Sequence, residues 1–148
     1  MAIDEKDQRI LNVLAQNCRL SFREIARKCH LSTVTVLNRM HRLEQEGIIK
    51  QYAAVLDYDR LGYDVQVIID LRISKGKLFE VEKRIATEPN IFALYDNTGH
   101  FDATIIGKFR TRSAMDKFLK RIQAYDFVER TETKLILNTI KEGGIRLP

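Results

Sequence analysis

The chain has 148 residues, with 25 Lys or Arg against 20 Asp or Glu, and its formal net charge is +5. This length suits one ordinary domain or two small ones, and the composition, 45% apolar and 30% charged, is typical of a soluble globular protein. No apolar run approaches the ~20 residues that span a bilayer, and the polar N-terminus does not resemble a secretory signal. We therefore expect a cytoplasmic protein.

The excess positive charge is confined to one segment. Residues 19–42 contain six Arg or Lys residues and one acid, Glu24, whereas the rest of the chain has equal numbers of basic and acidic residues. A basic patch of this kind favours contact with a phosphate backbone. Nucleic acid is therefore the first partner to consider.

Local signals predict three helices in the N-terminal third. Asp4, Ser21 and Ser32 are each placed to cap the start of a helix, and Glu24 has the spacing of a capping box with Ser21. The helix that follows Ser32 is expected to run to about Glu46, just before a glycine. A short turn between the second and third helices predicts a helix-turn-helix.

The third helix has a predicted core side and a predicted exposed side. Val36, Met40 and Leu43 are spaced to face inward. At 100° per residue, the opposite side and its flank carry small, hydrogen-bonding and basic residues, as a helix entering the major groove of DNA requires. These residues are Val34, Asn38, His41 and Gln45, with Thr35 and Arg42 on the flank. The alternative for such a surface is an ordinary solvated face.

Each side chain on this surface suggests a contact. Asn38 can bond an adenine edge at two points, and Arg42 suits guanine or phosphate. Val34 and Thr35 suit a thymine methyl group or a phosphate. Arg39 lies at the rim of the apolar stripe, so its head is expected to reach a backbone phosphate or a nearby acid.

The second half of the chain changes to strand-like alternation, which is clearest over residues 65–73. Further strands are predicted at 91–95, 101–109 and 128–140, with helices around 78–85 and 115–122. This β-α-β-β-α-β order is the split ferredoxin-like arrangement, an α+β fold with both helices on one face of a four-stranded antiparallel sheet.

The other face of the predicted sheet is also apolar. Ile68 and Ile106 point away from the helix-facing residues in this pattern, and the last strand places Ile136 and the pair Leu135 and Leu137 on opposite faces. We therefore expect this face to bury against another copy of itself in a two-fold dimer. The alternative is that the extended arm at 48–56 covers it.

The chain shows no signature of an enzyme or of a bound cofactor. Asp96, His100 and Asp102 cluster near a loop without a serine or cysteine nucleophile. Cys18 and Cys29 lack the further ligands of a zinc site and are expected to be thiols, with a disulfide as the alternative.

One turn and one strand suggest a small-molecule site. In the turn at 98–102, Gly99 allows backbone amides to face an anion, and Asp102 can accept from an ammonium group. Thr131 and Thr133 share one face of the last strand and can supply hydroxyl groups. An ordinary β-turn with surface threonines is the alternative.

Taken together, the chain resembles the Lrp/AsnC family, the feast/famine transcription regulators of bacteria and archaea. The similarity covers nearly the whole length. It is carried by Asp4, Asp7, Ile10-Leu11, Arg19-Leu20-Ser21, Leu31-Ser32, Arg39-Met40-His41-Arg42-Leu43-Glu44, Glu46-Gly47-Ile48-Ile49, Leu61-Gly62, Thr98-Gly99, Phe101-Asp102, Val128 and Thr131-Glu132-Thr133.

The resemblance implies an N-terminal winged helix-turn-helix and a C-terminal αβ-sandwich that forms dimers, commonly assembled further into octamers. It implies amino-acid effectors bound where dimers meet. By this similarity, the DNA-binding candidates are Ser32, Thr33, Val34, Thr35, Asn38, Arg39, His41 and Arg42. The effector-binding candidates are Gly99, His100, Asp102, Thr131 and Thr133.

Two positions depart from the family pattern. His30 stands where a glycine is usual between the two helices, and a left-handed conformation there costs roughly 1 kcal/mol for a residue with a side chain. Phe127 replaces the usual glycine before Val128, which bears on the seam between dimers and on the effector pocket.

We therefore expect a non-enzymatic, sequence-specific DNA-binding transcription regulator modulated by an amino acid or related small molecule. Its expected parts are a DNA-binding domain at 1–50, a linker at 51–62 and an oligomerisation and effector-binding domain at 63–148. A dimer would bind a pseudo-palindromic operator. The alternatives are a sequence-indifferent architectural DNA binder, and a ligand-binding or enzymatic module whose N-terminal helices only dimerise.

Overall fold

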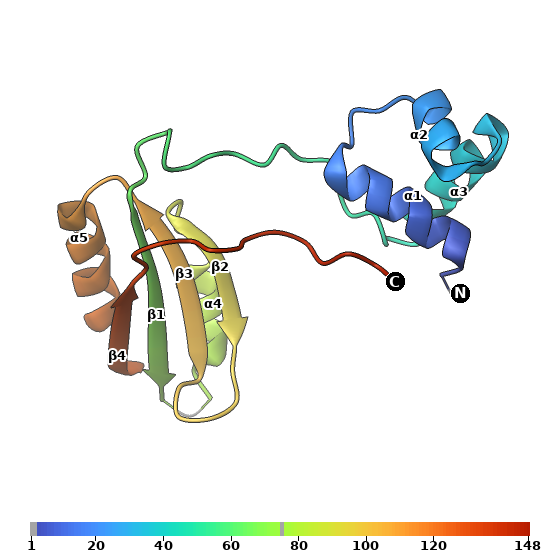
Figure 1. Cartoon of the computed structure of the whole chain (residues 1–148). Helices are drawn as coiled ribbons and strands as arrows, with labels where there is room; N and C mark the ends of the chain where they lie inside the picture. The colour runs from blue at the N-terminus through green and yellow to red at the C-terminus, as the bar shows by residue number, and fades with distance from the viewer. Residues whose placement is uncertain (1–2, 75) are drawn as a thin grey trace. The chain divides into compact units, whose positions relative to one another are not determined.

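The computed structural model describes residues 3–74 and 76–148 (Figure 1). The chain forms two compact units. One consists of Met1–Val55 together with Lys141–Pro148, and the other of Leu56–Ile140. The last eight residues thus group with the N-terminal unit.

The N-terminal unit contains three helices, α1 (Glu5–Gln16), α2 (Phe22–Cys29) and α3 (Thr33–Gln45). The predicted caps are confirmed, because the side chains of Asp4, Ser21 and Ser32 accept hydrogen bonds from backbone amides three residues later. Ser21 and Glu24 form the expected capping box, and Asp4 forms a second one with Asp7. These contacts fix where each helix begins.

One apolar core holds the three helices together. Ile10 and Leu14 of α1 pack with residues of α2 and with Val36 and Met40 of α3, which the spacing predicted to face inward. Cys29 is buried in this core and Cys18 is half-buried, and both are free thiols. Burial raises the pKa of the Cys29 thiol.

A left-handed residue makes the turn between α2 and α3. His30 has φ 54° and ψ 47°, and the amide of Leu31 donates to the carbonyl of Ala26 at 2.9 Å. A residue with a Cβ atom is strained in this conformation. The predicted strain at His30 is therefore present.

Residues 46–64 follow α3 as turns and extended chain. Gly47 ends α3 with φ 69°, a conformation that favours glycine. None of these residues lies in a strand. The wing implied by the family resemblance is thus not formed as paired strands.

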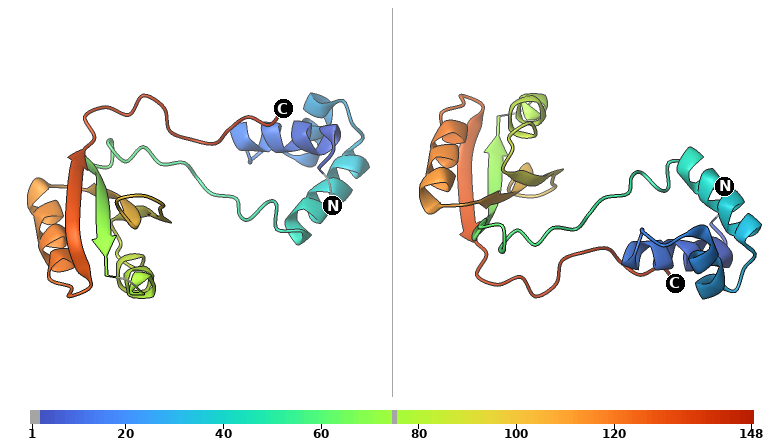
Figure 2. Two further views of the ribbon diagram at one scale, coloured as in Figure 1. Left: turned by 90° about the horizontal axis from the view of Figure 1, so that it is seen from below. Right: turned by 90° about the horizontal axis from the view of Figure 1, so that it is seen from above.

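The C-terminal unit has the predicted element order. Its elements are β1 (Val65–Ile73), α4 (Leu78–Ile85), β2 (Ile91–Asp96), β3 (Ala103–Phe109), α5 (Arg112–Gln123) and β4 (Val128–Leu135). The strands form one antiparallel sheet in the order β2-β3-β1-β4 (Figure 1). Figure 2 shows α5 running alongside β4 in both views.

The core of this unit lies between the sheet and both helices. Alternate residues of β1, from Val65 to Ile73, are buried with Ile85 of α4 and with Phe118 and Ile122 of α5. The prediction of two helices on one face is confirmed. Phe127, which departs from the family pattern, is buried in this core and stacks on Tyr125.

Two strands are shorter than predicted. The last strand ends at Leu135 rather than Ile140, and the third begins at Ala103 rather than Phe101. The amide of Ile136 donates to Gln66 at 2.8 Å, one residue after the start of β1. Residues beyond Ile136 therefore run past the end of their partner strand, although apolar residues continue to Ile140.

The second face of the sheet carries a half-buried apolar pair. Ile68 of β1 lies directly opposite Ile106 of β3. Beside them, Asp70 accepts from Thr104 at 2.5 Å and from Lys134 at 2.6 Å. This face is thus mixed, with charged residues around an apolar centre.

Candidate nucleic-acid interface and effector site

The candidate reading surface is the exposed side of α3. Val34 is 65% exposed, and Asn38 and His41 are also exposed. On the opposite side of the same helix, Val36 and Leu43 are 0% exposed. The helix thus presents Val34, Asn38 and His41 on one side, while its opposite side packs in the core.

The start of α3 is held by its own hydroxyl groups. Ser32 Oγ accepts from the Thr35 amide at 3.1 Å, and the two side-chain hydroxyls are 2.8 Å apart. Ser32 and Thr33 are exposed and Thr35 is half-buried. Ser32 therefore acts first as a helix cap.

Arg39 binds two acids at the start of α1. Its Nη1 lies 2.7 Å from both carboxylate oxygens of Asp4 and 2.8 Å from Oδ1 of Asp7. The sequence predicted that Arg39 reaches either a backbone phosphate or a nearby acid. In the structure it contacts acids, Asp4 and Asp7.

Arg42 also binds Asp7, through Nη2 and the second carboxylate oxygen. The Asp7 side chain is 0% exposed, whereas those of Arg39 and Arg42 are 21% and 31% exposed. One buried carboxylate is therefore shared by two arginines of α3. Sequence reasoning assigned Asp4 to a cap and gave Asp7 no role; its only signal was a second acid three residues after the cap.

The ion pair between Asp4 and Arg39 shifts the pKa of both residues. Hydrogen bonding by Arg39 lowers the pKa of Asp4 from its ordinary 3.8 to about 2. Hydrogen bonds to Asp4 and Asp7 raise the pKa of Arg39. The Asp4–Arg39 pair is thus ionised at neutral pH.

The turn of the candidate effector site folds back on β1. The carboxylate of Asp102 accepts from the Ile73 amide at 2.7 Å, and the Asp102 amide donates to Leu71 at 2.8 Å. Gly99 is exposed with φ 115°, a conformation that favours glycine. One oxygen of Asp102 thus holds the turn in place.

The two threonines of the candidate site lie on β4. Thr131 is paired in register with Leu71, the residue that also bonds Asp102, so the turn and Thr131 share one end of the sheet. Thr131 accepts from Gln123 of α5 at 2.8 Å, whereas Thr133 is exposed. Thr133 lies two residues further along the strand.

The structure gathers only part of this candidate set around one cavity. An open pocket of about 650 Å³ is lined by Asp70, Asp96, Asn97, Thr98, His100 and Phe101. It includes His100 but neither Asp102 nor the two threonines. Although burial raises the pKa of Asp70, hydrogen bonds from Lys134 and Thr104 outweigh it, so that pKa lies below its usual value.

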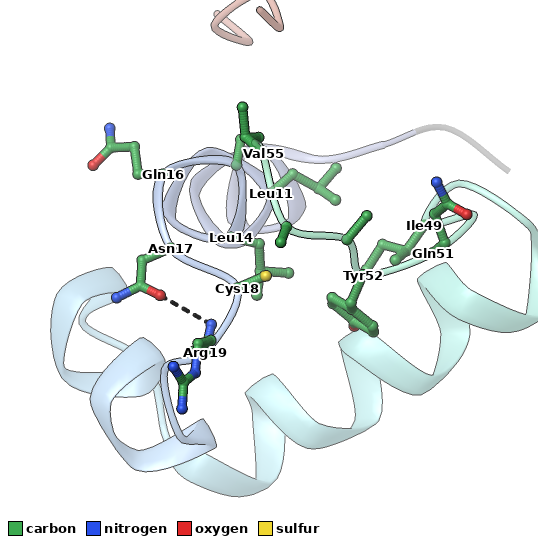
Figure 3. A pocket seen from close by; sticks show the side chains of 13 residues that line it. Leu11, Leu14, Gln16, Asn17, Cys18, Arg19, Ile49, Gln51, Tyr52 and Val55 are labelled. Carbon is green, nitrogen blue, oxygen red and sulfur yellow. Dashed lines mark hydrogen bonds between the residues drawn. The ribbon is translucent and has the colours of Figure 1, made fainter. Parts of the chain in front are cut away.

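A second pocket, of about 490 Å³, lies within the N-terminal unit (Figure 3). Apolar side chains of α1, including Leu11 and Leu14, face the extended segment that contains Tyr52 and Val55. Tyr52 donates to Glu44 at 2.7 Å. Burial and this hydrogen bond raise the pKa of Tyr52 to about 12. Sequence reasoning did not indicate this pocket.

Both halves of the chain match known domain families. Residues 3–44 match the AsnC-type helix-turn-helix domain, and residues 66–145 match the Lrp/AsnC ligand binding domain. The chain belongs to the Lrp/AsnC family. It is a transcription regulator of this family, and the family resemblance predicted from the sequence is confirmed.

Similar Lrp/AsnC proteins occur in archaea. The chain is 39% identical over 142 residues to an uncharacterized HTH-type transcriptional regulator of Pyrococcus furiosus, covering 96% of each chain. It is 35% identical over 143 residues to the HTH-type transcriptional regulator Ptr1 of Methanocaldococcus jannaschii, covering 96% of this chain and 97% of Ptr1.

Solved Lrp/AsnC structures have the same fold. Escherichia coli AsnC matches with a TM-score of 0.91 and 26% identity, covering 99% of this chain and all of that one. A Neisseria meningitidis regulator, determined as a complex with L-Met, matches with a TM-score of 0.90 and 27% identity, covering 99% of this chain and 97% of the other. Within the described residues, no helix is long and apolar enough to cross a membrane.

Proposed function

We propose that this Lrp/AsnC protein recognises specific sequences in double-stranded DNA by placing the exposed side of α3 in the major groove. The observation that carries the proposal is the row formed by Val34, Asn38 and His41, exposed on a helix whose other side is fully buried. Asn38 suits an adenine edge and Val34 a thymine methyl group. Ser32, Thr33 and Thr35, at the start of the helix, suit the adjacent phosphates.

In this proposal Arg39 and Arg42 have a different role from the side chains that contact bases. Because Arg39 and Arg42 bind Asp7, their first task is to hold α3 against α1. Base recognition then depends on the neutral side chains, and the arginines contribute positive potential at the flank of the groove.

We infer that the working unit is a dimer or a larger homo-oligomer, such as an octamer. The apolar pair Ile68 and Ile106 at the centre of the helix-free face of the sheet supports self-association, because apolar side chains on an uncovered sheet face favour burial against a partner. Two copies of α3 related by a two-fold axis would bind half-sites about one helical turn, or a multiple of it, apart. The expected operator is therefore pseudo-palindromic.

We further propose a non-enzymatic role in which an amino acid or related small molecule modulates DNA binding. Support comes from the match to the ligand-binding domain and from the L-Met complex of the Neisseria protein. The turn with Gly99, His100 and Asp102 and the strand with Thr131 and Thr133 remain the candidate contacts. In the single chain only the turn and Thr131 share one end of the sheet.

Selection of bound duplexes from a random pool tests the proposal. We expect the full chain to enrich a pseudo-palindromic motif, and Asn38→Ala to lose preference at one base pair in each half-site. Ser113→Ala, which changes an exposed residue of α5, is the matched control and should select the parent motif. Binding without enrichment would show an architectural DNA binder instead.

A repeat of the selection with a pool of the common amino acids tests the effector. We expect one of them to change the occupancy of the enriched motif. Unchanged occupancy with every amino acid would contradict the effector proposal and leave the DNA-binding proposal standing.

A further inference from the structure

Asp4 and Asp7, the two acids at the start of α1 that bind Arg39, differ in their exposure to solvent. The Asp7 side chain is 0% exposed, whereas that of Asp4 is 50% exposed. Both bind the same nitrogen, Nη1 of Arg39. Asp4 is therefore the partner that solvent or another anion can replace while Asp7 keeps its contact.

Arg39 lies beside the proposed reading surface. At 100° per residue, Arg42 and Thr35 lie between Asn38 and Arg39 on one flank of α3, and Arg39 lies where this flank meets the apolar stripe. When a helix occupies the major groove, its flanks face the phosphates that border the groove. The guanidinium group that Asp4 binds is thus within the region where a DNA phosphate would compete for it.

We propose that Asp4 restrains Arg39 from DNA phosphates and so limits the sequence-independent affinity of this protein. A phosphate contact increases affinity for every duplex, because it carries no sequence information. A carboxylate that occupies Arg39 removes part of that general affinity and leaves base recognition by Asn38 unchanged. Asp4 is in this sense a specificity-determining residue. This inference depends on the proposed placement of α3 on DNA.

Asp4 also caps α1, and the test must separate the two roles. The Asp4 side chain accepts from the Asp7 amide at 2.9 Å. Asn and Ser are N-cap residues about as effective as Asp. Asp4→Asn therefore keeps the cap and removes the charge that competes with phosphate, and Asp4→Ser does the same with a smaller side chain.

The experiment measures binding of the full chain to a random-sequence duplex over a range of salt concentrations. We expect Asp4→Asn to bind roughly three- to tenfold tighter than the parent at low salt. The slope of log affinity against log salt should steepen by about 0.9 for each α3 that gains the contact. Both effects should disappear in Asp4→Asn/Arg39→Gln, measured against Arg39→Gln alone.

The matched control is Glu5→Gln, which removes the same charge one residue away. Glu5 is 83% exposed and its ion pair with Arg9 is long, at 3.9 Å. We expect this variant to bind like the parent. Thermal unfolding checks that each variant is folded, and Asp4→Ser replaces Asp4→Asn if the latter is not.

The outcomes are distinct. If Asp4→Asn binds no tighter, or if Glu5→Gln gains as much, or if the gain persists without Arg39, the inference is wrong even though the protein binds DNA. If the parent does not bind duplex DNA at low salt, the proposed function itself fails.

Discussion

Asp7 Oδ1 lies 2.8 Å from Arg39 Nη1, and this contact joins the first turn of α1 to the middle of α3. The second oxygen of the same carboxylate binds Arg42. Because Asp7 is fully buried, it is the fixed point about which α3 is oriented. The position of the proposed reading helix therefore depends on an acid that does not itself face the groove.

Removal of this carboxylate should destabilise the N-terminal unit. We expect Asp7→Ala to lower the free energy of unfolding by roughly 1–3 kcal/mol, since the two arginines lose a partner but stay partly solvated. Urea denaturation of the full chain measures this. Asp116→Ala, which breaks the exposed pair with Lys120, should cost no more than about 0.5 kcal/mol. Equal costs for the two variants would contradict the role given to Asp7.

The Asp4–Arg39 pair predicts that the stability of the fold depends on pH in the acidic range. The folded-state pKa of Asp4, about 2, lies below the ordinary 3.8. A depressed pKa stabilises the fold fully above about pH 4, and that contribution is lost as the pH falls from about 4 to about 2. NMR titration of the Asp4 carboxyl carbon should show the low pKa, and Arg39→Gln should return it toward 3.8. A value near 3.8 in the parent would show that the pair does not form in solution.

The sequence predicted the helix starts well because an N-cap is a local signal. Asp4, Ser21 and Ser32 each contact an amide three residues away, so neighbours along the chain determine the outcome. The partner of Arg39 was less predictable, because Asp4 precedes it by 35 residues and only the packing of α1 on α3 brings them together.

The ends of the strands show the same difference between local signals, which the sequence reveals, and contacts between distant residues, which it does not. Alternation predicted the bounds of β1 correctly, but the apolar residues after Leu135 predicted a longer β4 than the structure has, because the chain beyond Ile136 runs past the start of β1. Likewise, Asp102 was assigned to a ligand from its residue type, although the folded turn directs one of its oxygens to the Ile73 amide. Strand pairing and loop packing depend on contacts between distant parts of the chain, and the periodicity of apolar residues does not predict these contacts.

Replacement of the strained turn residue should stabilise the protein. His30 has φ 54°, and glycine adopts this conformation without a steric cost. We expect His30→Gly to raise the free energy of unfolding by about 0.5–1 kcal/mol and His30→Val to lower it. Thermal unfolding compares the two. If His30→Gly is less stable than the parent, the imidazole makes a contribution that outweighs the strain.

The attachment of the C-terminal tail to α1 should depend on the side chain of Asn12. Asn12 accepts from the Leu147 amide at 2.9 Å and donates to the Leu147 carbonyl at 3.2 Å. We expect Asn12→Ala to accelerate hydrogen exchange of the Leu147 amide about fivefold, because roughly 1 kcal/mol of local stabilisation is lost. Gln16→Ala, one turn further along α1, should leave the exchange rate unchanged. Equal exchange in all three proteins would show that the tail is not bound to α1.

The most direct test of major-groove recognition alters the DNA and leaves the protein intact. Once a motif has been selected, its thymines are replaced by uracil and its adenines and guanines by their 7-deaza analogues, one at a time, which changes only the major-groove edges. We predict weaker binding at several positions, including the base pair at which Asn38→Ala loses preference. Affinity that is unchanged at every substituted position would contradict the placement of α3 in the major groove.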